Sequence, residues 1–205
     1  MLVEFNWYDL LIGIGILILF LPVLWWRKRN LSYLLFFSIF WIYLLAVVQA
    51  IFFPFAINTN DAGAIFRPSI NLIPFYFGAC FDMPALCVRG IIENIILTIP
   101  FGFGISFLVR IKPRNFFWLA ISVGLALEFT QLIISIFFKS GFRAVDVNDV
   151  ILNGFGVLLG YAFFRVFAWV YLKATDYFRI EHKWLFEDIY AVAFQAQVAG
   201  KSKNA

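Results

Sequence analysis

The chain has 205 residues, of which 63% are hydrophobic and 14% charged, and its mean hydropathy is +0.91. One water-soluble core cannot bury that much apolar surface, so the surplus must face lipid, and no separate soluble domain is expected. The net charge of +4 resides in short basic clusters beside apolar runs, which indicates membrane topology rather than nucleic-acid binding. Two cysteines and one histidine are too few for a Cys/His zinc cluster, and we expect neither a metal nor a cofactor.

Five hydrophobic runs approach the length of roughly 20 residues that a helix needs to cross the hydrocarbon core. They cover residues 10–26, 31–53, 91–109, 116–138 and 149–172. The first ends in Trp25 and Trp26 followed by three basic residues, an aromatic belt beside a cationic anchor, and Pro54 ends the second. The sequence therefore predicts an all-α, polytopic transmembrane bundle of about five spanning helices within residues 1–173.

The connection between the second and third runs, residues 54–90, contains a further apolar stretch at 65–81 that Pro68 and Pro74 interrupt. This stretch is too short and too broken to span, so we expect a re-entrant or interfacial segment. Cys80 and Cys87 lie in the same connection. They either form a disulfide, which an oxidising compartment outside the cytoplasm permits, or remain free thiols, and the sequence leaves both open.

Basic residues gather on one side of a five-pass layout, and the positive-inside rule makes that side cytoplasmic. They are Arg27, Lys28, Arg29, Arg110, Lys112, Arg114, Lys173, Arg179 and Lys183. The amino terminus is then expected outside and the carboxy terminus inside. Residues 174–205 are expected to form a cytoplasmic amphipathic tail, because apolar residues at helical spacing between 184 and 198 predict a helix lying on the inner leaflet.

Polar side chains converge on the outer half of the last three runs, where each ionisable group costs about 2.5–3.5 kcal/mol on insertion scales. Glu128 and Gln131 lie three apart, hence on one helical face, and Glu128 is about 16 Å from the outer end of its helix. Arg143, Asp146, Asp149 and Asn153 follow at intervals of three, three and four residues. They form one stripe if the helix of the fifth run begins as early as Arg143. The predicted polar cleft comprises Glu93, Asn94, Glu128, Gln131, Arg143, Asp146, Asp149 and Asn153.

These residues admit several roles. An internally compensated ion-pair network would only order the bundle. A functional cleft would bind an envelope ligand, perform acid/base chemistry on a lipid-linked substrate, or relay protons in a transporter. For Gly102, Gly156 and Gly160 we expect close helix packing, and for Pro100 a kink.

Four motifs occur together in one order and spacing. They are Asn71-Leu-Ile-Pro74-Phe75, Glu93-Asn94 followed by Pro100-Phe-Gly102, Glu128-x-x-Gln131, and Arg143-x-x-Asp146-x-x-Asp149-x-x-x-Asn153-x-x-Gly156-x-x-x-Gly160. Through them, residues 70–164 resemble the VanZ-like family of bacterial membrane proteins. The resemblance implies a bacterial cell-envelope protein of the cytoplasmic membrane, in a family whose namesake is associated with low-level resistance to teicoplanin-type glycopeptides. It supplies no reaction, so the motif residues carry over as a shared polar site.

The sequence thus favours a membrane protein that acts in glycopeptide resistance or envelope homeostasis by binding or modifying a component of the outer leaflet or wall. An intramembrane enzyme that uses carboxylates on a lipid-linked precursor is the alternative, and a proton-coupled transporter or flippase is the second. The expected partners are membrane lipids and a lipid-linked wall component or lipoglycopeptide. Nucleic acid is not an expected partner, and the oligomeric state stays open.

Overall fold

The computed structural model describes residues 2–27, 29–56, 69–77, 79–139, 145–180 and 183–201. Within them, five helices are long and apolar enough to cross a membrane, which confirms the predicted all-α membrane bundle and makes the chain a multi-pass membrane protein. These helices are α1 (Trp7–Trp26), α2 (Leu31–Phe52), α4 (Pro84–Leu108), α5 (Asn115–Phe137) and α6 (Val147–Phe178). The short α3 (Ala79–Asp82) precedes α4, and α7 (Leu185–Lys201) follows α6.

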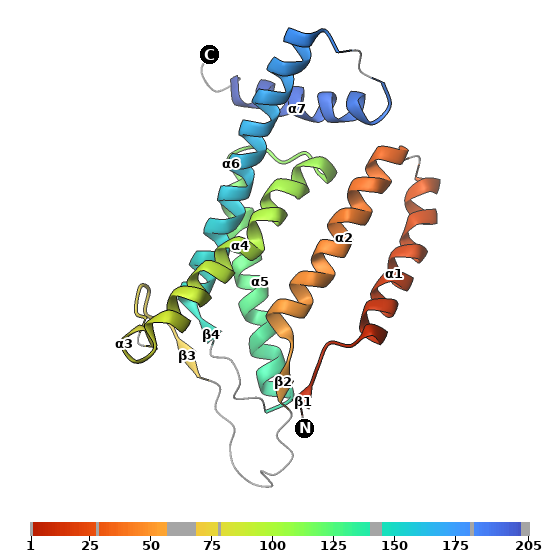
Figure 1. The fold of residues 1–205 in the computed structure, drawn as a ribbon. Helices are drawn as coiled ribbons and strands as arrows, with labels where there is room; N and C mark the ends of the chain where they lie inside the picture. Colours follow the sequence, from red (N-terminus) through yellow and green to blue (C-terminus); the bar gives the residue numbers. More distant parts are fainter. Residues whose placement is uncertain are drawn as a thin grey trace.

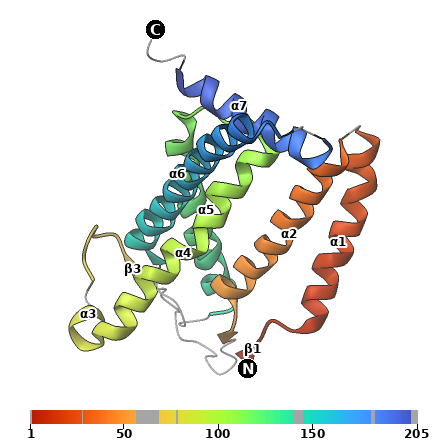
Figure 2. The same ribbon diagram turned by 45° about the horizontal axis from the view of Figure 1, so that its top comes forward.

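The helix α6 is the centre of the bundle. It packs against α4, α5 and α7, whereas α2 packs against α4, and α1 packs against α2 on the periphery. Figures 1 and 2 show α7 lying across one end of the bundle, beside the connection between α1 and α2, and the amino terminus at the other end. Two cross-helix hydrogen bonds fix the outer helices, from Trp41 Nε1 to the Gly13 carbonyl at 2.9 Å and from the Tyr43 hydroxyl to the Leu97 carbonyl at 2.7 Å.

Short strands of two residues each lie at the end of the bundle that holds the amino terminus (Figure 1). The strand β1 (Leu2–Val3) pairs antiparallel with β2 (Phe55–Ala56), which ties the chain before α1 to the chain after α2. The strand β3 (Ile70–Asn71) pairs parallel with β4 (Val145–Asp146). The segment between α2 and α4 is thereby attached to the start of α6.

Two helices extend beyond their predicted bounds. The helix α4 begins at Pro84 rather than near residue 91, and proline suits a first helical turn because its missing N–H has no intrahelical acceptor there. The helix α6 has 32 residues and ends at Phe178 rather than at 172, so it is about 48 Å long. Because the hydrocarbon core is about 30 Å thick, α6 extends past it. The helix α7 packs against α6, where Gln197 Nε2 donates a hydrogen bond to the Arg165 carbonyl and the Tyr171 hydroxyl donates one to the Phe186 carbonyl.

Glycines set the distance between α4 and α6. A methyl group added at Gly102 would collide with the carbonyl oxygen of Val157, and one at Gly160 would collide with the carbonyl oxygen of Ile99. The Thr98 hydroxyl bridges the same contact by donating a hydrogen bond of 2.8 Å to the Asn153 carbonyl. The packing role predicted for these glycines therefore follows from backbone atoms that a side chain would displace.

Gly160→Ala is expected to lower the free energy of unfolding by about 1–3 kcal/mol, because the facing backbone cannot yield as a flexible side chain would. Thermal unfolding of the purified protein in detergent measures the change. The matched control is Gly15→Ala, since an added methyl at Gly15 has nothing within 4 Å. Equal transition temperatures for the two variants would show that the helices separate freely at this contact.

Candidate functional site

The pairing of β3 with β4 brings two polar residues together that are far apart in the sequence. Asn71 lies opposite Asp146 in the parallel register, and its Nδ2 donates a hydrogen bond of 3.0 Å to Asp146 Oδ1. The Val145 N–H donates to the Ser69 carbonyl at 2.9 Å and completes the attachment. Asp146 thus takes part in two structures at once, the strand pair and the amino-terminal cap of α6.

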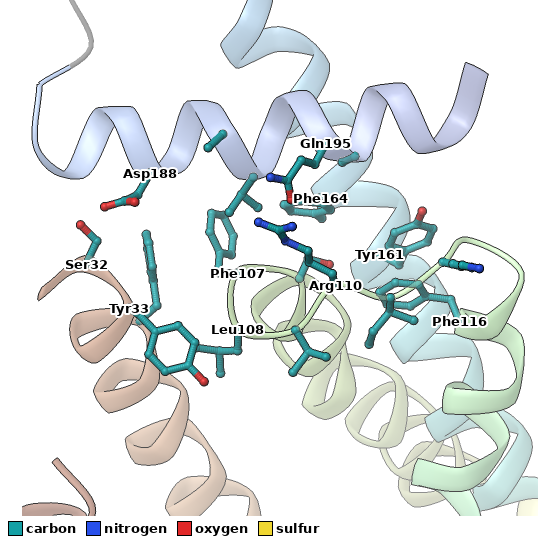
Figure 3. Close-up of a pocket in the computed structure, with 18 of the residues that line it drawn as sticks. Ser32, Tyr33, Phe107, Leu108, Arg110, Phe116, Tyr161, Phe164, Asp188 and Gln195 are labelled. Atoms are coloured by element: carbon teal, nitrogen blue, oxygen red, sulfur yellow. The ribbon is translucent and has the colours of Figure 1, made fainter. Parts of the chain in front are cut away.

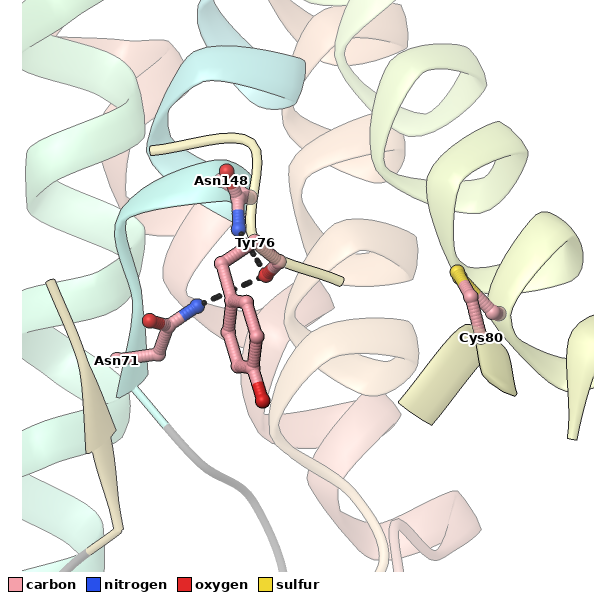
Figure 4. The surroundings of a disulfide bond; sticks show 5 residues. Asn71, Tyr76, Cys80 and Asn148 are labelled. Atoms are coloured by element: carbon pink, nitrogen blue, oxygen red, sulfur yellow. Dashed lines mark hydrogen bonds between the residues drawn. A yellow bond between two sulfur atoms is a disulfide. The ribbon is translucent and has the colours of Figure 1, made fainter. Parts of the chain in front are cut away.

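Two asparagine side chains hold the turn that follows β3. Asn148 accepts a hydrogen bond of 2.5 Å from the Phe75 N–H and donates one of 2.9 Å to the Tyr76 carbonyl. Asn71 donates to the same carbonyl at 3.2 Å and accepts from the Ile73 N–H at 3.1 Å (Figure 4). Phe75 has a φ of 63°, a conformation that costs a side-chain-bearing residue about 1–3 kcal/mol unless its surroundings impose it. The two asparagines supply that restraint.

Three carboxylates meet the beginning of α6. Glu128 of α5 is 4% exposed, and its Oε2 accepts a hydrogen bond of 3.1 Å from the Asp146 N–H. Asp146 Oδ1 caps the helix by accepting from the Asn148 N–H at 2.8 Å. Asp149, in the first turn, accepts a bond of 2.6 Å from Asn94 Nδ2 of α4. The positive end of the α6 dipole stabilises negative charge at the start of the helix. The free-energy cost of burying the three carboxylates is therefore lowest there.

One turn further into α6, Asn153 is 2% exposed. Its backbone carbonyl accepts the Thr98 hydrogen bond, and its side-chain Oδ1 is buried without a hydrogen-bond partner among the described residues. Buried polar atoms are nearly always hydrogen-bonded in proteins, so this oxygen is an acceptor available to a donor group that reaches it. We call Asn71, Asn94, Glu128, Asp146, Asn148, Asp149 and Asn153 the outer polar cluster, because they lie at the end of the bundle that the sequence predicts to face outside.

The structure does not bring every predicted residue into this cluster. Glu93 is 59% exposed and pairs with Arg89 at 2.6 Å, one turn earlier on α4, an exposed contact that does not involve the other carboxylates. Gln131 is half-buried on α5, one turn beyond Glu128. Arg143 lies outside the described residues. Pro74 and Phe75 belong to the turn that Asn148 and Asn71 hold, and Pro100 lies inside α4.

Sequence reasoning missed Asn148, although it makes three of the hydrogen bonds that assemble the site. Asn148 does not belong to the stripe of polar residues at spacings of three and four. The available signal was that Asn148 is polar and lies between two aspartates at the start of an apolar helix. No local pattern indicated that the turn after β3 would pack on Asn148.

Cys80 and Cys87 form a disulfide with a Cα–Cα distance of 5.1 Å. The bond joins α3 to the first turns of α4, close to the turn at Tyr76 (Figure 4). It therefore shortens the free connection between the asparagine-held turn and the helix that carries Asn94.

The family comparison covers this whole site. A family model described as VanZ/LLP1 matches residues 40–168, which extend from within α2 to within α6 and include every residue of the outer polar cluster. No curated protein and no solved structure matches the chain.

Asn148→Ala is expected to free the turn at residues 73–77, because it removes two hydrogen bonds worth about 1 kcal/mol each. Amide hydrogen exchange in this turn should accelerate by roughly tenfold or more. Tyr76→Phe is the matched control, since the cluster uses the Tyr76 carbonyl and the side chain is 56% exposed. Unchanged exchange in Asn148→Ala would mean that other contacts hold the turn.

Proposed function

The chain belongs to the VanZ/LLP1 family, and from that premise we propose that it is a protein of the bacterial cytoplasmic membrane whose outer polar cluster binds a component of the outer leaflet or wall. The outcome that we propose is teicoplanin-type glycopeptide resistance or envelope homeostasis. The observation that carries the proposal is the gathering of Glu128, Asp146 and Asp149 at the start of α6, under a turn that two asparagines hold.

The chemistry of the cluster supports a ligand that donates hydrogen bonds. Ionised carboxylates only accept them, with about four acceptor positions each, and the amide oxygen of Asn153 adds one more. An amine or a hydroxyl group of a lipid-linked wall precursor or a lipoglycopeptide fits such a set. The acceptors are already oriented by backbone N–H groups and asparagine side chains, so binding costs little further ordering.

The orientation of the bundle is part of the proposal. Arg27 and Arg29 follow α1, and Arg110, Lys112 and Arg114 lie between α4 and α5. Both connections lie at the end of the bundle opposite the strands (Figure 1). Basic connections favour the cytoplasmic side, which supports a carboxy terminus inside and an outer polar cluster that faces outside.

Binding is favoured over catalysis because Glu128 already makes a hydrogen bond that helps to hold the fold together. Glu128 accepts the Asp146 N–H that begins α6, so an acid/base cycle at Glu128 would disturb the hydrogen bond that positions the helix. The same bond argues against Glu128 as a mobile proton relay. Direct retention of the purified protein on an immobilised lipoglycopeptide or envelope lipid separates the binding reading from both alternatives.

Growth of a susceptible Gram-positive host on teicoplanin tests the function. The wild type is expected to raise the concentration that stops growth, and Asp149→Asn and Glu128→Gln are expected to lose part of that protection. An amide keeps the shape but loses the charge, which weakens a charge-assisted contact by roughly tenfold. Glu93→Gln is the matched control, because this side chain is exposed and paired with Arg89 outside the cluster.

All variants are compared at equal abundance in the membrane. A wild type that is well expressed and gives no protection would refute the resistance outcome, and the envelope lipids of cells lacking the protein would then be the next measurement. If Glu93→Gln lost protection to the same extent as Asp149→Asn, the result would show that the function does not depend on the outer polar cluster. Complete loss in Glu128→Gln, with ligand retention intact, would favour the enzyme instead.

A further inference from the structure

A cavity of about 590 Å³ opens at the end of the bundle opposite the outer polar cluster. It lies between α2, the end of α4, the start of α5, α6 and α7, and α7 crosses over it (Figure 3). Its inner wall is aromatic, formed by Tyr33 and Phe36 of α2, Phe107 of α4, and Tyr161 and Phe164 of α6. Phe107 and Phe164 contact each other edge to face at 5.4 Å, so the wall is continuous between α4 and α6.

The mouth of the cavity is cationic. Arg29, Arg110 and Lys112 line it against a single carboxylate, Asp188. None of the three cations pairs with a carboxylate in the part of the chain that the structure describes. Asp188 Oδ1 accepts a hydrogen bond of 2.6 Å from Asn30 Nδ2, a neutral residue that also lines the cavity. Among the described lining residues, three cations therefore stand against one carboxylate, which leaves an excess of positive charge.

Neutral polar groups extend this mouth inward. The Ser106 Oγ is buried and makes no hydrogen bond among the described residues, although most buried hydroxyls do. Figure 3 shows Gln195 of α7 directed toward Arg110. The cavity thus combines cationic and hydroxyl donors with aromatic side chains (Figure 3), a lining that suits a ligand both anionic and apolar.

We propose that this cavity binds an anionic phospholipid of the cytoplasmic leaflet, with the phosphate at Arg29, Arg110 and Lys112 and the first part of an acyl chain along the aromatic wall. Basic pockets between transmembrane helices on the cytoplasmic side suit such headgroups, and the basic connections place the mouth at headgroup depth. A volume of about 590 Å³ holds a headgroup and the beginning of its chains, and the remaining chain length continues along the bundle into lipid. The site does not depend on the outer cluster's ligand; only the leaflet rests on the proposed orientation.

The helix α7 is positioned to respond to the lipid. It is held at the bundle end by the Asn30 bond to Asp188 and by the Tyr171 hydroxyl, which donates to the Phe186 carbonyl at 3.1 Å. Phe186 and Phe194 are half-exposed on α7, which suits a helix that also contacts the leaflet surface. A bound headgroup would join α2, α7 and the connection after α4 through one phosphate.

The test uses the full-length protein in a neutral detergent, titrated with phosphatidylglycerol, phosphatidylcholine or soluble glycerol phosphate. Native mass spectrometry counts retained lipid, and thermal unfolding gives the stabilisation at each concentration. Phosphatidylglycerol is expected to bind and to raise the transition temperature, and the other two probes are expected to do neither. Equal retention of phosphatidylcholine would refute recognition of charge, and equal stabilisation by glycerol phosphate would identify a soluble anion site instead.

Arg110→Gln is expected to weaken phosphatidylglycerol binding at least tenfold, because it removes a charge-assisted contact with the phosphate. Arg114→Gln is the matched control, since Arg114 is an exposed residue of the same connection that does not line the cavity. Ser106→Ala, a smaller change inside the cavity, should weaken binding less than Arg110→Gln and more than the control. An equal loss in Arg114→Gln and Arg110→Gln would show diffuse attraction by the basic connection and overturn the site.

Discussion

The close contact between α4 and α6 is the constraint on which the rest of the structure depends. Helices in lipid gain no hydrophobic free energy from pairing, so their association rests on backbone proximity and hydrogen bonds. Gly102 and Gly160 let the facing carbonyl oxygens approach, and Thr98 joins the helices through the Asn153 carbonyl. Any larger side chain in this contact would move α4 relative to α6 along their shared length.

Both polar ends of the molecule are built from the same helix pair. One turn before Thr98, Asn94 of α4 reaches Asp149 of α6 and completes the outer polar cluster. Toward the other end, Phe107 of α4 meets Phe164 of α6 in the wall of the cavity. The two regions differ in charge, since carboxylates gather at the first and arginine and lysine at the second. A displacement of α4 against α6 would therefore alter an acidic and a basic region together, although they lie at opposite ends of the bundle.

The sequence predicts those features that depend on helical periodicity and hydrophobicity, and it fails where distant segments meet. The five spanning helices follow from apolar length, and the stripe through Asp149 and Asn153 follows from a spacing that returns to one helix face. Glu93 pairs with Arg89 instead of joining the cluster, and this pair exists because α4 begins early enough to place Arg89 one turn before Glu93. The polarity of Asn148 is visible in the sequence, but its role arises only when the turn after β3 docks. Residues of α2, α4, α5, α6 and α7 line the cavity, so no local pattern reveals it.

We propose that the acidic cluster faces outside and that the basic cavity faces the cytoplasm, and reporter fusions that reveal the orientation of the chain test this placement. Two fusions after Ala205 would be compared, one to a fluorescent reporter that folds only in the cytoplasm and one to a phosphatase that is active only outside. A phosphatase inserted within residues 59–63 supplies the opposite face. We expect fluorescence and no phosphatase activity at the carboxy terminus, and phosphatase activity at the insertion. Phosphatase activity after Ala205, with none at 59–63, would show that the chain has the opposite orientation and that each proposed site faces the other side of the membrane.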